Sequence, residues 1–419
     1  MTAWRWLASG LTLAGAAVGA GAAGAIEARA PLVGAPSSNA RRGPVPEHTV
    51  SGVSSGGDMA VNHLVAFSRS TTGAAIVAGA PYGCNLVENG DSDWCGAGDP
   101  WVPWSALLSR LSMHLRLRAM QGLIDPPSLL WGRRVYLFSG MWDPAVHRGV
   151  MEALREQLGG LTGYRSLVAD FDVPATHGWV VDGRTCGPGG PEPGSPGSPC
   201  GACCCEPGAL LACPGHDLAG RLLWHLSGGQ GDFRGANATG AAGGRVAAAA
   251  AGRWLAVPQA WYLPQGLSLE KAGLWTSAYV YAPAGCYSTG PGGCQVHVHY
   301  HGCAWGAQFT GFDIIGRLGL LEWADFLRIV LVFPQASDSI DSAGCWDWTG
   351  ETSPLFDTQL GPQLATVTSL LADLPRLLMQ GDDANKTSGL EGRTATTVDV
   401  GAGPRAGAPE ATGGASVLV

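Results

Sequence analysis

Apolar runs about as long as one β-strand recur along the chain, separated by longer stretches with helical periodicity. We expect these runs to form strands over residues 73–80, 134–140, 166–173, 278–282, 295–300 and 328–334. The last run is rich in β-branched residues without alternation, which is typical of a parallel strand covered on both faces. Strands that alternate with helices predict an α/β fold with a mostly parallel central sheet flanked by helices.

Apolar residues at helical spacing predict helices over residues 56–70, 145–158, 316–326 and 359–378. The last of these is amphipathic, so we expect it to pack on the sheet. Two regions have no periodic apolar residues: 186–215 is rich in Gly, Pro and Cys, and 228–252 is rich in Gly and Ala. We interpret the first as a loop insertion and the second as a connection.

The two ends of the chain differ from the middle. Arg5 precedes an apolar run from Trp6 to Ala25 that ends in an A-x-A site, which predicts a signal peptide over 1–25. Gly and Ala fill this run and Leu is scarce, which favours cleavage over an uncleaved membrane anchor. Residues 26–46 resemble a linker, 47–380 a single domain and 381–419 a disordered tail.

Composition narrows the class of protein. Hydrophobic residues make up 46% of the 419 residues, charged residues only 14%, and the net charge is −8. This balance argues against a nucleic-acid partner and against an anionic membrane. Sparse charge suits a neutral, apolar substrate, although a general bias toward Gly and Ala explains it equally well. Twelve cysteines behind a signal peptide predict a disulfide-bonded, extracellular protein, which we expect to be a monomer.

The segment Val50–Gly57 predicts a strand that runs into a Gly-x-Ser-x-Gly turn at Ser54. This sharp elbow raises a serine hydroxyl above the sheet of an α/β hydrolase. A chain with 64 glycines can contain this pattern by chance. The pattern therefore indicates a nucleophile only if a base and a carboxylate are also found at suitable positions.

A serine nucleophile needs an imidazole base and a carboxylate that orients it, in the chain order Ser, Asp, His for this fold. Asp143 follows the strand that ends at Gly140, and His177 follows the next short strand. Taken singly, Asp143 is a helix cap and His177 an ordinary loop histidine. Ser54, Asp143 and His177 together at matching strand ends instead predict a catalytic triad.

The developing oxyanion needs fixed donors, and the backbone N–H groups of Ser55 and Cys303 are the candidates. Cys303 follows a His-Gly pair at a strand end, a position that precedes the elbow in conventional α/β hydrolases. Here it comes far downstream, so we expect a circularly permuted α/β-hydrolase fold. His297, His299 and His301 could instead bind a metal, but no nearby carboxylate supports that alternative, and we expect neither metal nor cofactor.

Several motifs in order carry a family resemblance. They are VSGVSSGGDMAVNHLVAFS, AGAPYGC, SGMWDPAV, ATHGW, HYHGC, WAD, VFPQA and GCWDW. Over about residues 48–380 the chain resembles the circularly permuted, single-domain extracellular polyhydroxybutyrate depolymerases of the fungal type. The resemblance implies cleavage of poly(3-hydroxyalkanoate) esters through an acyl-enzyme by the triad and oxyanion donors named above.

The resemblance also assigns substrate contacts and shows departures. It implies that Trp348 lines the crevice for the polymer, and we add Trp346 and Trp179 as candidate contacts. Gly178-Trp179 replaces the usual continuation after the histidine, and Asp58 replaces an aromatic residue expected shortly after the elbow. These departures bear on the substrate more than on the reaction.

The cysteines fall into pairs that the family partly shares. We expect disulfides between Cys84 and Cys95, Cys286 and Cys294, Cys186 and Cys213, and Cys303 and Cys345; Cys200, Cys203, Cys204 and Cys205 remain without an assigned pairing. A zinc site from Cys200, Cys203, Cys213 and His216 is the alternative, which an oxidising compartment disfavours.

The sequence therefore predicts a secreted serine esterase that hydrolyses a poly(3-hydroxybutyrate)-type polyester or a small ester. No nucleic-acid partner is expected, and no membrane partner after signal cleavage. One alternative is a feruloyl, acetyl or other carboxylesterase of the same fold. Another is a catalytically silent surface protein that adsorbs to polymers through aromatic rings.

Overall fold

The computed structural model describes residues 43–87, 95, 104–182, 209–213, 215–229, 252–286 and 293–387. The predicted signal peptide, nearly all of the predicted linker, most of the insertion and connection, and the tail beyond Thr387 lie outside the described residues.

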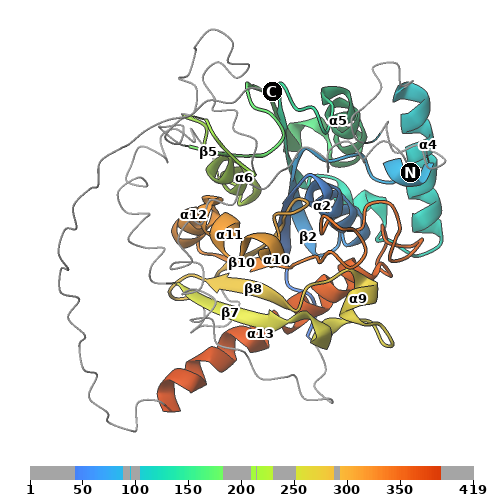
Figure 1. Cartoon of the computed structure of the whole chain (residues 1–419). Helices are drawn as coiled ribbons and strands as arrows, with labels where there is room; N and C mark the ends of the chain where they lie inside the picture. The colour runs from blue at the N-terminus through green and yellow to red at the C-terminus, as the bar shows by residue number, and fades with distance from the viewer. Residues whose placement is uncertain are drawn as a thin grey trace, which may run out of the picture.

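An eight-stranded sheet forms the centre of the molecule, in the order β4-β3-β2-β1-β9-β10-β8-β7 (Figure 1). All pairs from β4 to β10 are parallel, and β8 runs antiparallel to both of its neighbours. The strands are β1 His48–Val53, β2 Thr71–Val77, β3 Arg134–Gly140, β4 Leu167–Val173, β7 Arg253–Pro258, β8 Ser277–Ala282, β9 Gln295–Tyr300 and β10 Ile329–Phe333. The predicted, mostly parallel sheet is confirmed.

The order of strands places the start of the described chain at the centre of the sheet. β1 pairs in parallel with β2 on one side and with β9 on the other, although β9 follows it by more than 200 residues. Strands β1 to β4 form one half of the sheet, and β7 to β10 form the other half. This arrangement fits a permuted chain, because the strand before the oxyanion loop lies beside the elbow strand but comes later in sequence.

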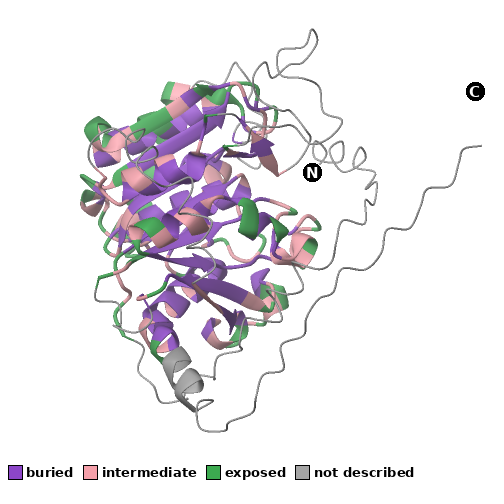
Figure 2. Ribbon diagram, turned by 90° about the vertical axis from the view of Figure 1, so that its left-hand side faces the viewer, coloured by how far each residue is buried: buried purple, intermediate pink, exposed green. Residues whose placement is uncertain are grey.

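Helices cover both faces of the sheet, as expected for an α/β fold (Figures 1 and 2). One core contains side chains from α2 (Ser55–Ala66), α4 (Trp104–Met120), α5 (Arg148–Thr162) and α13 (Pro362–Thr387). The second core, on the opposite face, contains side chains from α6 (Leu218–Leu226), α11 (Asp313–Arg317) and α12 (Leu320–Leu327). Figure 2 shows the strands buried between these layers.

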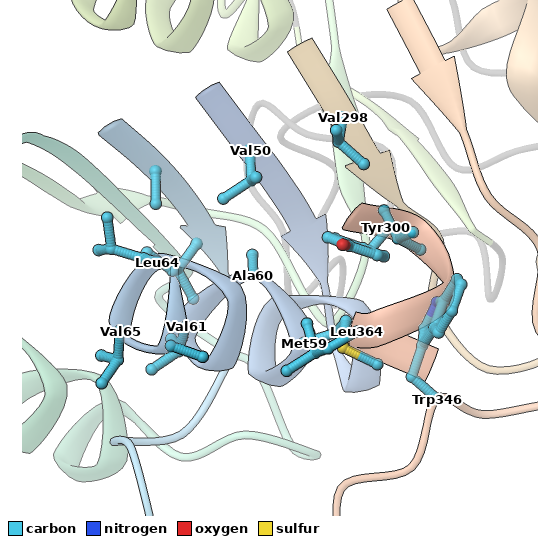
Figure 3. Close-up of a cluster of buried hydrophobic side chains, with 14 of the residues drawn as sticks. Val50, Met59, Ala60, Val61, Leu64, Val65, Val298, Tyr300, Trp346 and Leu364 are labelled. Atoms are coloured by element: carbon cyan, nitrogen blue, oxygen red, sulfur yellow. The ribbon is translucent and has the colours of Figure 1, made fainter. Parts of the chain in front are cut away.

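Helix α2 is almost entirely enclosed, which fixes its position against the central strands of the sheet. Met59 and Leu64 are at most 1% exposed and lie in the same cluster as Val50 of β1 and Val298 of β9 (Figure 3). Burial of a side chain of this size contributes about 1.5–3 kcal/mol. The helix that follows the elbow is therefore held firmly against the two central strands.

Short elements complete the structure, and several helices differ from their predicted bounds. α5 begins at Arg148 rather than 145, because Asp143 first caps a separate turn. Gly319, at φ 77°, separates α11 from α12 where one helix was expected. α13 runs to Thr387, past the boundary placed at 380. The remaining elements are α3 Cys84–Val87, α9 Leu269–Ala272, α10 Ala307–Thr310, β5 Trp179–Val181, β6 Leu210–Ala212, η2 Pro127–Leu130, η3 Tyr164–Ser166 and η4 Gln259–Tyr262.

Three predicted disulfides are confirmed: Cys84–Cys95, Cys286–Cys294 and Cys303–Cys345. Cys213 is also in a disulfide, so it offers no free thiolate for the alternative zinc site, and the other cysteines of that site lie outside the described residues. Within the described ranges, no helix has the length and apolar character needed to span a membrane.

A ladder of hydroxyl and imidazole groups crosses the sheet on one face of β1 and β9. The His297 ring bonds Thr49 Oγ1 and Ser51 Oγ, each at 2.7 Å, and Ser51 Oγ lies 2.9 Å from His299 Nδ1. Both rings are almost fully buried. Among the described residues there is no cluster of three or more His, Cys, Asp or Glu suited to a metal ion. These histidines instead satisfy the polar groups of neighbouring strands.

A second group of rings lies on the opposite face, where α2 covers the sheet. His63 Nε2 lies 3.0 Å from His48 Nε2, and His63 Nδ1 lies 2.6 Å from the Tyr300 hydroxyl. Burial lowers the pKa of His48 to about 4 and that of His297 to about 3, and it holds the pKa values of His63 and His299 well below the ordinary value. All four rings are therefore neutral in the folded protein at neutral pH.

Acid is expected to unfold the protein through these rings. Their folded pKa values lie below the unfolded value of about 6.5, so their contribution is complete above pH 6.5 and is lost as pH falls toward 4. Protonation of each ring lowers the free energy of unfolding by up to about 1.4 kcal/mol per pH unit in that window. Urea unfolding followed by tryptophan fluorescence between pH 7 and 4.5 measures this loss. His297→Gln should flatten the dependence, and exposed His147→Asn should not; equal slopes for both variants would contradict the explanation.

Candidate active site

The residue between β1 and α2 has the backbone of a strained elbow. Ser54 has φ 58° and ψ −127°, a conformation that costs a non-glycine residue free energy and is found at functional sites. Its N–H donates to Val77 O at 2.9 Å, and its carbonyl accepts from the N–H groups of Gly57 at 2.7 Å and Asp58 at 3.2 Å. The turn is thus fixed by bonds to β2 and to the first turn of α2, and Ser54 remains partly exposed.

Both glycines of the Gly-x-Ser-x-Gly pattern are required by close backbone approach. A Cβ at Gly52 would lie 1.9 Å from Gly56 O, and a Cβ at Gly56 would lie 2.3 Å from Tyr300 O at the end of β9. Only hydrogen fits at these positions. The pattern is therefore a packing requirement of this fold and no accident of a glycine-rich chain.

Asp143 and His177 meet at the ends of adjacent parallel strands, β3 and β4. His177 Nδ1 lies 2.9 Å from Asp143 Oδ2 and 3.1 Å from Oδ1. The Asp143 side chain is 1% exposed and the His177 side chain 21% exposed. Asp143 Oδ1 also accepts from the N–H groups of Ala145 and Val146, at 2.8 and 2.9 Å. Asp143 thus caps a turn, as the simpler interpretation predicts, and also holds the imidazole.

The loops that carry these two side chains are bonded to each other. Met141 N–H donates to Val173 O at 2.9 Å, and Trp142 N–H donates to Ala175 O at 3.0 Å. A Cβ at Gly140 would lie 2.3 Å from Ala175 O, so the two loops are close enough that only glycine fits at this position. Main-chain contacts therefore set the position of the carboxylate relative to the imidazole.

Ser55 and Cys303 lie together because β1 and β9 are neighbours in the sheet. The Cys303 sulfur is 3.3 Å from Ser55 Oγ, although 248 residues separate them. Across the described part of the chain, neither backbone N–H donates a hydrogen bond to a protein group. Two free N–H groups beside an elbow serine are the donors that an oxyanion requires.

The loop before Trp346 braces the candidate oxyanion donors, as the predicted disulfide between Cys303 and Cys345 indicated. The disulfide joins Cys303 to Cys345, and Ala304 N–H donates to Ala343 O at 2.5 Å. Trp346 N–H then donates to Ser55 Oγ at 3.3 Å. The disulfide predicted from the cysteine pattern was the one available signal for this bracing.

His301 lies beneath the same loop and is fully enclosed. Its Nε2 accepts from Ala336 N–H at 3.1 Å, and the Trp346 indole N–H donates to His301 O at 3.1 Å. Burial lowers the pKa of His301 to about 4, so the ring is a neutral acceptor. It positions the backbone that leads to Gly302 and Cys303.

Two of the three predicted tryptophan contacts are corrected by burial. Trp346 and Trp179 are both 0% exposed. The Trp346 ring packs on Tyr300 in the core under the elbow helix (Figure 3), and Trp179 donates from its indole to Leu318 O at 2.9 Å. Rings sealed from solvent cannot contact a substrate. Trp348 is partly exposed and lines a pocket beside α2, so it alone remains a candidate.

Sequence reasoning missed other members of that pocket. Asp58 was noted only as a departure from an aromatic position, and Asn62, Asn85 and Phe356 carried no signal, because nothing in their spacing indicates a common cavity. They come together only through the packing of α2, α3 and the loop before α13.

Two curated relatives are similar over most of the chain. A poly(3-hydroxybutyrate) depolymerase of Delftia acidovorans is 32% identical over 329 residues, which cover 77% of this chain and 58% of the relative. A polyhydroxybutyrate depolymerase of Talaromyces funiculosus is 26% identical over 333 residues, covering 76% of this chain and 86% of the relative. No family model matches the chain. The resemblance indicated by the motifs is confirmed, although the chain spans little more than half of the Delftia relative.

Two solved structures share the fold. One is the crystal structure of the PHB depolymerase from Penicillium funiculosum, 22% identical, and the other is a serine-to-alanine variant of a PHB depolymerase complexed with an R3HB trimer, 23% identical. Each match has a TM-score of 0.60 and covers 81% of this chain and 98% of the other. The predicted α/β-hydrolase-type fold is confirmed by these matches together with the sheet order.

The close approach at Gly56 generates a stability test. Gly56→Ala should lower the free energy of unfolding by at least about 3 kcal/mol, because the new methyl group overlaps the backbone of Tyr300. Gly316→Ala is the control, since nothing lies within 4 Å of that Cβ, and it should be neutral or stabilise by about 0.5–1 kcal/mol. Thermal and urea unfolding measure both; similar stabilities would refute the packing argument.

Proposed function

We propose that this relative of the polyhydroxybutyrate depolymerases is a serine esterase that hydrolyses a poly(3-hydroxybutyrate)-type polyester through Ser54, His177 and Asp143. The observation that carries the proposal is the hydrogen-bonded Asp143–His177 pair at the strand edge where the strained Ser54 elbow also lies. Carboxyl ends of parallel strands share one edge of the sheet, which is the usual place for a site in such folds.

In the proposed acylation step, His177 Nε2 takes the proton from Ser54 as its oxygen attacks the ester carbonyl. Asp143 keeps the proton on Nδ1, so Nε2 is the free base, and it stabilises the imidazolium that forms. The N–H groups of Ser55 and Cys303 bind the oxyanion of the tetrahedral intermediate. Collapse breaks the ester bond, and the imidazolium returns its proton to the leaving alcohol.

The second half of the proposed reaction repeats the same proton transfers with water. His177 removes a proton from the water that attacks the acyl-enzyme, and the same two N–H groups bind the second oxyanion. The imidazolium then protonates Ser54 as the acid product leaves. The fixed donors cost no reorganisation during reaction, because the disulfide loop and α2 already hold them in place.

The choice of a polyester rests on the named relatives and on Trp348. Both curated relatives are named for poly(3-hydroxybutyrate), and the partly exposed Trp348 ring offers an apolar surface beside the elbow helix. Secretion is part of the proposal: the disulfides, which persist in oxidising compartments, support it together with the predicted leader.

Removing the proposed nucleophile tests the reaction. Ser54→Ala should lower kcat by at least about 10,000-fold on poly(3-hydroxybutyrate) film and on p-nitrophenyl butyrate, and should abolish labelling by a fluorophosphonate probe. Ser112→Ala, an exposed serine of α4, is the matched control and should retain activity. Acid release by the Ser54→Ala variant at the wild-type rate would refute the mechanism, and absence of labelling in wild type would favour the silent polymer-adsorbing protein.

Disrupting the carboxylate tests its orienting role. Asp143→Asn should lower kcat about 1,000- to 10,000-fold, since the amide favours the wrong imidazole tautomer. Asp172→Asn changes a carboxyl on β4 whose side chain is 90% exposed, and should leave kcat within about 2-fold. Steady-state kinetics on p-nitrophenyl butyrate compare the two. Equal effects would mean that Asp143 only caps its turn.

A further inference from the structure

The segment that carries His177 is held at two points, one on each side of the imidazole. On the N-terminal side, Ala175 O accepts from Trp142 N–H at 3.0 Å. On the C-terminal side, the next residue with a main-chain hydrogen bond is Trp179. In the described part of the chain, the N–H groups of residues 176–178 donate to no protein group. The place of the His177 backbone therefore depends on these two anchors.

The C-terminal anchor, Trp179, is fixed through both its main chain and its side chain. It begins β5, which pairs with β6 outside the eight-stranded sheet (Figure 1). Its N–H donates to Ala209 O at 2.8 Å, and its indole N–H donates to Leu318 O at 2.9 Å, in the turn between α11 and α12. The Trp179 ring is 0% exposed. A buried bond of this kind is costly to lose, because the carbonyl then has no donor in its place.

The Trp179 ring also contacts the imidazole ladder beside the strand that leads to the proposed nucleophile. It meets the His299 ring edge to face, with 5.0 Å between the ring centroids and 80° between the ring planes. His299 Nδ1 lies 2.9 Å from Ser51 Oγ, three residues before Ser54. His299 and Ser51 are at most 2% exposed. A run of buried contacts thus connects the strand that ends at Ser54 with the segment that carries His177.

Glycine at position 178 allows this anchor to lie directly after the base. A Cβ at Gly178 would lie 2.9 Å from two atoms of the Leu211 side chain and 3.3 Å from Ala209 O. Leu211 is 1% exposed, so it has little room to move aside. The family resemblance leads one to expect another continuation after the histidine, and Gly178-Trp179 stands in its place. This departure from the family therefore forms the anchor.

We propose that Trp179 is a positioning residue, whose buried indole sets the place of His177 relative to Ser54. The inference rests on the proposed esterase function and adds a residue that acts through the base. Asp143 orients the imidazole, whereas Trp179 holds the backbone from which the imidazole extends. A misplacement of about 1 Å between reacting groups lowers a rate by up to about 100-fold, even when the substrate binds as before.

The test separates turnover from substrate binding. Trp179→Phe keeps an aromatic ring in the core and removes the indole N–H. We expect kcat on p-nitrophenyl butyrate to fall at least about 10-fold with KM within about 3-fold, because the base moves and the substrate surface does not. Labelling by a fluorophosphonate should slow by a similar factor, since it also needs His177 to take the Ser54 proton. Gly178→Ala moves the anchor but keeps the indole, and should lower kcat at least about 3-fold with KM unchanged.

Trp323→Phe is the matched control for the loss of a buried indole bond. Trp323 is 1% exposed in the same core as Trp179, and its indole N–H donates to Asp217 Oδ2 at 2.7 Å. Both Phe variants should lower the melting temperature, by on the order of 5 °C, since each loses a buried hydrogen bond. Only Trp179→Phe should lower kcat, measured well below both melting temperatures.

The outcomes distinguish the positioning role from the esterase function. Wild-type kcat in Trp179→Phe, an equal loss of kcat in both Phe variants, or a rise in KM at unchanged kcat would overturn the role of Trp179 and leave the esterase intact. If one of the Trp179→Phe and Gly178→Ala variants does not fold, the other decides. A wild type that hydrolyses no ester and is not labelled would remove the proposed function, and the positioning role with it.

Discussion

The whole site depends on one close backbone contact, where the first turn of α2 presses against the ends of β1 and β9. Gly56 touches the carbonyls of Tyr300 and His301, and Gly52 touches Gly56 itself, at distances that leave no room for a Cβ. At this contact Ser54 has a positive φ, and the Ser55 side chain lies beside Cys303. The buried face of α2, with Met59 and Leu64, offsets the strain by packing against the central strands.

Around that contact, the loops of the site are bonded to one another and to segments that lie far away in the sequence. The Asp143 loop is bonded to the His177 loop through main-chain groups, and the oxyanion loop is tied to a distant segment by Cys303–Cys345. In the proposed reaction, such bracing would keep the hydrogen-bond donors in place before a substrate binds, so that no reorganisation is needed as charge develops. The neutral histidines beneath the strands serve the same end, because they satisfy polar groups without adding buried charge.

Helix α2 carries residues of both the proposed active site and the small pocket beside it. Its first turn carries Ser55, whose N–H is a proposed oxyanion donor, and also Asp58, which lines the pocket.

Local patterns alone determined a large part of this protein. The strands Arg134–Gly140 and Gln295–Tyr300 have the predicted bounds, and the Gly-x-Ser-x-Gly spacing predicted the elbow, because strand periodicity and glycine requirements act over a few residues. Asp143 and His177 could be paired from their places after consecutive strands. Only the tertiary structure showed that Trp346 and Trp179 are sealed in the core and that Asn85 and Asp58 line one pocket. Exposure and shared cavities depend on what packs against a side chain from distant segments, and no periodicity along the chain records that.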